Sequence, residues 1–250
     1  MAQLFRPSSN VIAKAGIGAL AVAPWLIMFI GSKISRSPYN TKVGIAIDQP
    51  IPFSHRHHVS ELGLDCRHCH TKVEKSAHAG IPSTQVCMNC HVQTWKNSPL
   101  LKPVHESWNS GKPIAWQLVN KVPEFVYFRH DIHIERGVAC SQCHGPIQDM
   151  HMTAKGQAFE MKWCLNCHRE SEKFLYRDKE SIEKQLSPRE QVFNLYLKHQ
   201  SGVPLSNRER TLLEGVDYKA TPAEIEKGKH LKKKLGVNTK QLEDCSVCHH

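Results

Sequence analysis

The chain has 250 residues, enough for one or two ordinary domains, but aromatic residues make up 7 % of it and the mean hydropathy is −0.44. This composition argues against a conventional hydrophobic core, because the residues beyond the N-terminal segment are more polar still. The formal net charge of +10 and the pI near 9.1 would ordinarily indicate nucleic acid or an acidic surface as a partner.

The first predicted element is a transmembrane anchor in residues 1–31. From Val11 to Gly31 the sequence is apolar apart from Lys14, and 21 residues are enough to span a bilayer as a helix. A cleaved signal peptide is the alternative. Pro24 and Trp25 lie late in the apolar run, and the residues after Gly31 make a poor cleavage site, so we expect a retained helix. Residues 32–52, with three prolines, are predicted to form a tether.

The sequence Cys-x-x-Cys-His occurs five times after the tether and uses all ten cysteines of the chain. This motif is the attachment signature of c-type haem: the two cysteines form thioethers to the porphyrin and the histidine binds the iron. Zinc sites are the alternative, but tetrahedral zinc would need these motifs in pairs, five is odd, and zinc needs no histidine after each pair. We therefore expect five covalently bound haem c groups. The predicted thioether residues are Cys66, Cys69, Cys87, Cys90, Cys140, Cys143, Cys164, Cys167, Cys245 and Cys248, and the predicted proximal iron ligands are His70, His91, His144, His168 and His249.

The first four motifs belong to an internal repeat. In each copy the sequence Phe-x-His-x-x-His precedes two haem motifs, and the copies begin at Phe53 and Phe128. This predicts one dihaem module with its connector in residues 53–127 and a second module in 128–169. Two histidines three apart on a helical turn point in neighbouring directions, so they can reach two porphyrins but not one iron. The predicted distal ligands of four haems are therefore His55, His58, His130 and His133, with His57 as their nearest rival; the sequence leaves open which histidine serves which haem.

Residues 170–250 are predicted to form a helical segment that ends with the fifth haem. Helix-start signals with a capping box and an early proline occur at 187–190 and at 221–224, and the second leads into a basic helix that stops at Gly236. The distal ligand of the fifth haem stays open. A methionine would raise the potential of that haem relative to a histidine. The candidates are Met150, Met161, Met152, His230 and His199.

Only roughly 43 residues remain for each haem, too few for separate globin-sized folds. The porphyrins must then supply much of the core. We expect a mostly α fold with much irregular structure, in which a single N-terminal transmembrane helix precedes a multihaem c-type cytochrome domain organised around the haems. The propionates of the haems also offset the basic charge, so nucleic acid is not an expected partner. The sequence indicates no catalytic residue, and the chain is not expected to be an enzyme on its own.

The repeated Phe-x-His-x-x-His with paired haem motifs resembles the class III and c7-type multihaem cytochromes. The whole layout is similar to the pentahaem cytochrome subunit of bacterial alternative complex III, a quinol:electron-acceptor oxidoreductase. The likeness rests on the single span, residues 53–91 and 98–130, the sequence Trp-Cys-Leu-Asn-Cys-His at 163–168 and the terminal fifth motif. The resemblance implies several partners: an iron–sulfur subunit related to molybdopterin oxidoreductases, polytopic quinol-binding subunits and a monohaem cytochrome c. It implies a periplasmic cytochrome c or a haem–copper oxidase as the electron acceptor.

Covalent haem attachment takes place outside the bacterial cytoplasm, so the haem domain is expected in the periplasm, held to the inner membrane by one span. The favoured function is electron transfer within a membrane quinol-oxidising respiratory complex. One alternative is a multihaem reductase of nitrite or hydroxylamine, which needs an iron with an open position, and the surplus of histidines argues against it. Another is a membrane-anchored quinol dehydrogenase that donates electrons to a periplasmic reductase such as nitrite reductase.

Overall fold

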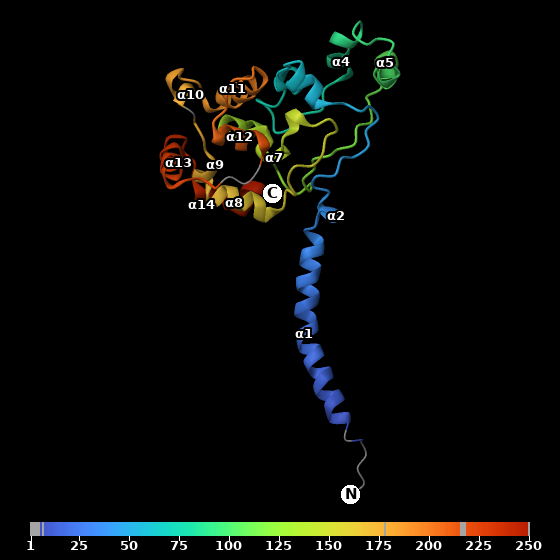
Figure 1. The fold of residues 1–250 in the computed structure, drawn as a ribbon, viewed down its shortest axis with the longest axis vertical. Coiled ribbons are helices and arrows are strands. Elements are labelled where there is room, and N and C mark those ends of the chain that lie inside the picture. The colour runs from blue at the N-terminus through green and yellow to red at the C-terminus, as the bar shows by residue number, and fades with distance from the viewer. Residues whose placement is uncertain (1–5, 7, 178, 216–218, 250) are drawn as a thin grey trace. The chain divides into compact units, whose positions relative to one another are not determined.

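The computed structural model describes residues 6, 8–177, 179–215 and 219–249, and the chain separates into two compact units, Met1–Val43 and Gly44–His250 (Figure 1). The first unit is built on α1 (Ser9–Ser35), and a short helix, α2 (Pro38–Thr41), follows it. The 27 residues of α1 rise about 1.5 Å each and so extend about 40 Å. Among the described residues, α1 is the one helix long and apolar enough to cross a membrane.

No side chain of α1 is buried, and the helix continues through Pro24. A proline is tolerated in such helices when local adjustments satisfy the carbonyl that it leaves free. The helix ends four residues beyond Gly31, the end expected from the apolar run. The apolar run shows only which part of the helix suits the interior of a bilayer. The helix itself is longer, because its hydrogen bonds continue into the polar residues around Lys33.

The described part of the second unit is helical and irregular and contains no strand; one isolated antiparallel bridge joins Ala46 to Ala154. The mostly α fold class is therefore confirmed. Residues 53–127 contain a π-helix, η1 (Arg56–Glu61), then α3 (Cys66–Cys69), α4 (Thr84–His91), the 3-10 turn η2 (Pro99–Leu101) and α5 (Lys102–Ser110). Residues 128–169 contain α6 (His130–Glu135), α7 (Cys140–His144), the 3-10 turn η3 (Ile147–Asp149) and α8 (Met161–Arg169).

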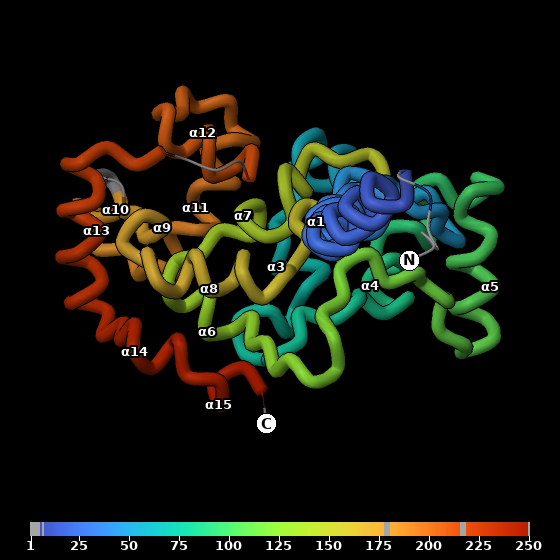
Figure 2. Tube along the Cα trace, turned by 90° about the horizontal axis from the view of Figure 1, so that it is seen from below, coloured from blue at the N-terminus to red at the C-terminus, as the bar shows by residue number. Residues whose placement is uncertain are grey.

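The C-terminal part is a series of helices that Figure 2 shows along one side of the second unit. They are α9 (Ser171–Phe174), α10 (Lys179–Glu183), α11 (Pro188–Gln200), α12 (Asn207–Glu214), α13 (Pro222–Lys234), α14 (Thr239–Leu242) and α15 (Cys245–Cys248). The capping boxes predicted at the starts of α11 and α13 are confirmed. A third capping box, formed by Ser206 and Glu209, starts α12 and was not predicted.

The buried apolar side chains form three small clusters rather than one core. The largest packs α11 and α12 against the start of α7 and contains Ala139, Val192, Leu195, Tyr196, Leu212 and Leu213. The second contains Ile51, Met88, Leu101 and Val104, and the third Val73, Ile134 and Phe193. Among the described residues, 14 apolar side chains are buried, which is few for a unit of this length. The polypeptide alone therefore supplies little of the apolar interior that such a fold needs.

Candidate haem-binding site

Each Cys-x-x-Cys-His motif lies on a short helix, which brings its two thiols to one side because residues three apart on a helix are neighbours. Three of these helices, α3, α7 and α15, begin at the first cysteine. Aspartates cap two of them: Asp65 accepts a hydrogen bond from the Arg67 N–H at 2.8 Å, and Asp244 accepts one from the Ser246 N–H at 3.0 Å. No disulfide joins any of the ten cysteines.

Four of the five motif histidines are oriented by a backbone carbonyl. In each, Nδ1 donates a hydrogen bond to an oxygen, which fixes the ring and leaves the Nε2 lone pair available for a metal. The pairs are His70 with Gly80 (2.8 Å), His91 with Thr94 (3.0 Å), His168 with Leu242 (3.2 Å) and His249 with Phe125 (3.0 Å). This is the arrangement that a metal-binding imidazole requires.

The predicted distal histidines are held in the same manner. Three of them donate from Nδ1 to a backbone carbonyl oxygen. The pairs are His58 with Ser54 (2.9 Å), His130 with Ala77 (2.8 Å) and His133 with Arg129 (2.7 Å). The Nδ1 of His55 is 3.1 Å from the Thr153 hydroxyl. Within the described residues, the Nε2 atoms of these four rings make no hydrogen bond, so all four can bind a metal.

The structure brings three predicted distal histidines opposite three motif histidines. The ring centroids are 6.2 Å apart for His58 and His91, 6.3 Å for His130 and His144, and 6.2 Å for His133 and His168. Two imidazoles on opposite sides of one metal, with bonds of about 2 Å, have centroids about 6.4 Å apart. The observed spacings therefore fit six-coordinate haem irons with two histidine ligands each.

Burial favours the neutral form of His144 and of the four predicted distal histidines by lowering their pKa. It lowers the pKa of His55 and of His144 to about 4, with further lowering from the charge of His70 in the first case and of His130 in the second. Burial likewise lowers the pKa of His58, His130 and His133, although hydrogen bonds to backbone carbonyls oppose it. A neutral imidazole is the form that binds iron, so the electrostatics agree with the geometry.

A phenylalanine packs against each histidine pair, and the two copies of the repeat match closely. The ring of Phe53 lies 4.9 Å from His55, edge-on, and 4.5 Å from His58. The ring of Phe128 lies 4.8 Å from His130, again edge-on, and 4.5 Å from His133. The two copies of the sequence repeat therefore share one side-chain arrangement, in which a phenylalanine packs against two imidazoles.

The thiols of successive motifs lie close to one another in an order that differs from the chain order. Contact with Cys140, together with burial, raises the pKa of the Cys66 thiol, so the first and third motifs meet. Burial and the charges of Cys87 and Cys90 raise the pKa of Cys69, which places the second motif beside the first.

The remaining motifs continue from the third. Burial, followed by the charge of Cys167, raises the pKa of Cys143 to about 12, and burial and the charge of Cys248 raise the pKa of Cys164. These charges place the third motif near the fourth and the fourth near the fifth.

The candidates for the fifth distal ligand have different surroundings. Within the described residues, no hydrogen bond, ion pair or ring contact joins any of them to His249. The Met150 sulfur accepts a hydrogen bond from the Ala154 N–H at 3.5 Å, and the Nε2 of His199 is 3.3 Å from an Asp149 oxygen. Met152 is half-buried in the loop after η3, Met161 is exposed at the start of α8, and His230 is exposed on α13.

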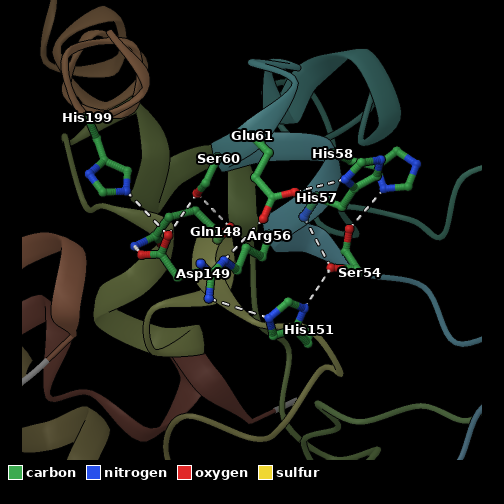
Figure 3. Close-up of polar contacts among 10 residues, drawn as sticks. All are labelled: Ser54, Arg56, His57, His58, Ser60, Glu61, Gln148, Asp149, His151 and His199. Carbon is green, nitrogen blue, oxygen red and sulfur yellow. Dashed lines mark hydrogen bonds and ion pairs between the residues drawn. The ribbon is translucent and has the colours of Figure 1, made fainter. Parts of the chain in front are cut away.

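Polar side chains lie around His57 and His58 (Figure 3). The Nδ1 of His57, the rival ligand, is 2.9 Å from a Glu61 oxygen. His151 contacts Ser54 at 3.5 Å and Arg56 at 3.4 Å. His57 and His151 therefore both have polar partners within the protein. The sequence did not indicate which backbone carbonyls orient the rings, because every residue type has a carbonyl. The Thr153 hydroxyl was not predicted either.

Comparisons with known proteins agree with this geometry. The family described as cytochrome c7 and related cytochrome c matches residues 126–189, which include the third and fourth motifs. The chain is 35 % identical over 122 residues to the menaquinone reductase multiheme cytochrome c subunit of Nitratidesulfovibrio vulgaris, covering 48 % of this chain and 51 % of that protein. It is 30 % identical over 96 residues to cytochrome c-552 of Porphyromonas gingivalis, covering 35 % of this chain and 16 % of that protein.

The match thus spans about half the length of the first relative and a smaller share of the second. The Cys-x-x-Cys-His motifs and the paired imidazoles of this chain are features expected of a protein similar to these cytochromes. The part of the chain in 126–189 is thus similar to cytochrome c7 and related cytochromes c, and its Cys-x-x-Cys-His motifs have the residues that covalent attachment of haem c requires.

Proposed function

We propose that this chain is the electron-transfer subunit of a membrane quinol-oxidising respiratory complex of the alternative complex III type. Electrons would pass through its five haems to a periplasmic cytochrome c or a terminal oxidase. The observation that carries the proposal is the set of imidazole pairs 6.2–6.3 Å apart with Nε2 free. Such pairs close both sides of an iron, which suits electron transfer and leaves no position for a substrate.

The protein residues have defined roles in this proposal. The ten cysteines anchor the porphyrins, and the five motif histidines are the proximal ligands. We propose His58 for the motif of Cys87, His130 for that of Cys140 and His133 for that of Cys164, and the ring spacings support this assignment. His55 remains for the motif of Cys66, and His70 is the neighbour whose charge affects the pKa of His55 most. When bound, each haem supplies a reversible one-electron change at its iron. The Nδ1 hydrogen bonds hold the ligands in place during that change, so little of the protein has to rearrange.

For the fifth motif we place Met161 first among the candidates. It begins α8, the helix that also carries Cys164, and the Cys164 thiol neighbours Cys248 of the fifth motif. The other four candidates lack this connection. His199 is engaged with Asp149, and Met150 with the backbone of its own loop.

We further propose that α1 anchors the chain in the inner membrane and that the haem domain lies in the periplasm. The proposed partners are an iron–sulfur subunit related to molybdopterin oxidoreductases, polytopic quinol-binding subunits and a monohaem cytochrome c. The likeness to a menaquinone reductase subunit supports a quinone-linked complex. One span offers no enclosed quinol pocket, so quinol would bind in a partner.

The decisive experiment is to isolate the native complex from membranes and to identify its subunits by mass. We expect polytopic and iron–sulfur subunits to copurify, this chain to carry the mass of five haems, and added quinol to reduce those haems. Recovery with a periplasmic nitrite reductase alone would instead support the donor function. A chain that lacks five haem masses, or haems that quinol does not reduce in the complex, would refute the proposal.

A further inference from the structure

The four predicted distal histidines differ in the group that orients the ring. His58, His130 and His133 donate from Nδ1 to backbone carbonyl oxygens at 2.9, 2.8 and 2.7 Å. The Nδ1 of His55 instead contacts a side chain, the Thr153 hydroxyl, at 3.1 Å. Within the described residues, this ring is thus the one of the four that a side chain orients, and a substitution can remove that side chain.

The two copies of the repeat supply these partners to each other. His55 is the first histidine of its pair in the first copy, and Thr153 follows the third haem motif, in the second copy. His130 has the same place in the second copy, and its acceptor, Ala77, follows the first haem motif. The partners are 98 and 53 positions apart, so both contacts form only when the two copies fold together. One acceptor is a hydroxyl and the other is a carbonyl.

The loop that carries Thr153 is fixed on both sides. On one side, the Arg56 N–H donates to the Met150 oxygen at 3.0 Å, which ties the loop to η1. On the other side, Ala154 forms the isolated bridge with Ala46. Thr153 lies between these two contacts and is half-buried. Its hydroxyl is therefore held in place by the backbone on either side of it.

Iron binding would decide the direction of the hydrogen bond. An imidazole that binds a metal through Nε2 carries its proton on Nδ1, so the His55 ring would donate and the Thr153 oxygen would accept. A bond from Nδ1 raises the basicity of the ring, and a more basic ligand favours ferric over ferrous iron. The hydroxyl contact is longer than the three carbonyl contacts and therefore weaker. His55 would then be the least basic of the four ligands.

We propose that Thr153 is a positioning residue, whose hydroxyl orients the His55 ring and thereby sets the reduction potential of the iron that this ring binds. The inference rests on the proposed function, in which His55 is a distal ligand, and it holds whichever haem motif carries that iron. A merely structural threonine would affect only stability. Thr153 instead shifts the redox equilibrium of one haem and leaves the other four unchanged.

The test is a potentiometric titration of the full-length holoprotein in detergent, followed in the haem absorption bands without quinol. Thr153→Val keeps a β-branched side chain and removes the hydroxyl. We expect one of the five haems to become easier to reduce. At a given potential its ratio of reduced to oxidised iron should rise about tenfold, which is about 59 mV for a one-electron change. Thr153→Ser retains the hydroxyl and should restore the original potential.

Two further variants serve as controls. Thr84→Val removes another half-buried hydroxyl, whose hydrogen-bond partner is Ser107 at 2.6 Å rather than a ligand histidine, so all five potentials should stay unchanged. His55→Ala should open one iron to carbon monoxide after reduction, which verifies that His55 is a ligand. If valine disturbs the loop, Thr153→Ala removes the same hydroxyl and should give the same shift. Unchanged spectra of the oxidised haems would verify that the threonine variants are folded.

Three results would overturn the proposal: unchanged potentials without the Thr153 hydroxyl, an equal shift in Thr84→Val, or no carbon monoxide binding by His55→Ala. Because no quinol is present, the shift can be observed even if quinol fails to reduce the haems in the native complex. That outcome would refute the proposed function and leave the role of Thr153 in place.

Discussion

Replacement of His133 by alanine tests the assignment of ligands from ring spacing. The His133 ring lies 6.2 Å from His168, donates to the Arg129 oxygen at 2.7 Å and packs 4.5 Å from Phe128. Under the proposed assignment, the substitution removes one axial ligand and opens one of five irons. After reduction, we expect the variant to bind one carbon monoxide for every five haems, whereas the unaltered protein binds none. The lost packing and hydrogen bond should also cost about 2 kcal/mol of stability.

The assay is a carbon monoxide titration followed in the haem absorption spectrum. His151→Ala is the matched control, because His151 contacts Ser54 and Arg56 and lies outside the ring pairs. It should bind no carbon monoxide. The reasoning from ring spacing is refuted if His133→Ala binds none, or if the control binds as much.

Three further predictions concern single residues. Met161→Leu should abolish the sulfur-to-iron charge-transfer band in the near infrared and lower the potential of one haem; retention of both in a redox titration would remove Met161 from the candidates. Tyr196→Phe should lower the free energy of unfolding by about 1–3 kcal/mol in denaturant titrations, because the buried Ser141 N–H loses its acceptor at 2.9 Å. Gly228→Ala should cost about 1–3 kcal/mol in the same assay, since the added Cβ overlaps the Glu172 carbonyl; an unchanged midpoint would mean that α13 does not pack there.

The haem chemistry was readable from the sequence because thioether attachment needs fixed residue types at fixed spacing. The repeat was readable for the same reason, and the structure reproduces it in the packing of Phe53 and Phe128 on their histidine pairs. The pairing of His58 with His91 was not readable. It depends on how η1 and α4 lie in space, and neither histidine carries a local signal of its partner.

The motif order was also beyond the sequence. Cys66 and Cys140 are 74 positions apart, yet their thiols meet, because the two halves of the repeat pack against each other through contacts such as His130 with the Ala77 carbonyl. Backbone carbonyls accept hydrogen bonds whatever their side chain, so position 77 gave no indication of this role. By contrast, the capping box of Ser206 and Glu209 is a sequence signal that was present and overlooked.

The cover over the third motif has a consequence for how the protein is made. Ala139 and Ser141, on either side of Cys140, are 3 % and 0 % exposed, and Tyr196 and Leu212 close over them. Cys140 itself is half-buried, and this cover narrows the approach to its sulfur, so we expect haem attachment to be faster before the C-terminal half folds. The chain order agrees with this expectation, because Cys140 is synthesised before Tyr196 and Leu212, which cover its neighbours.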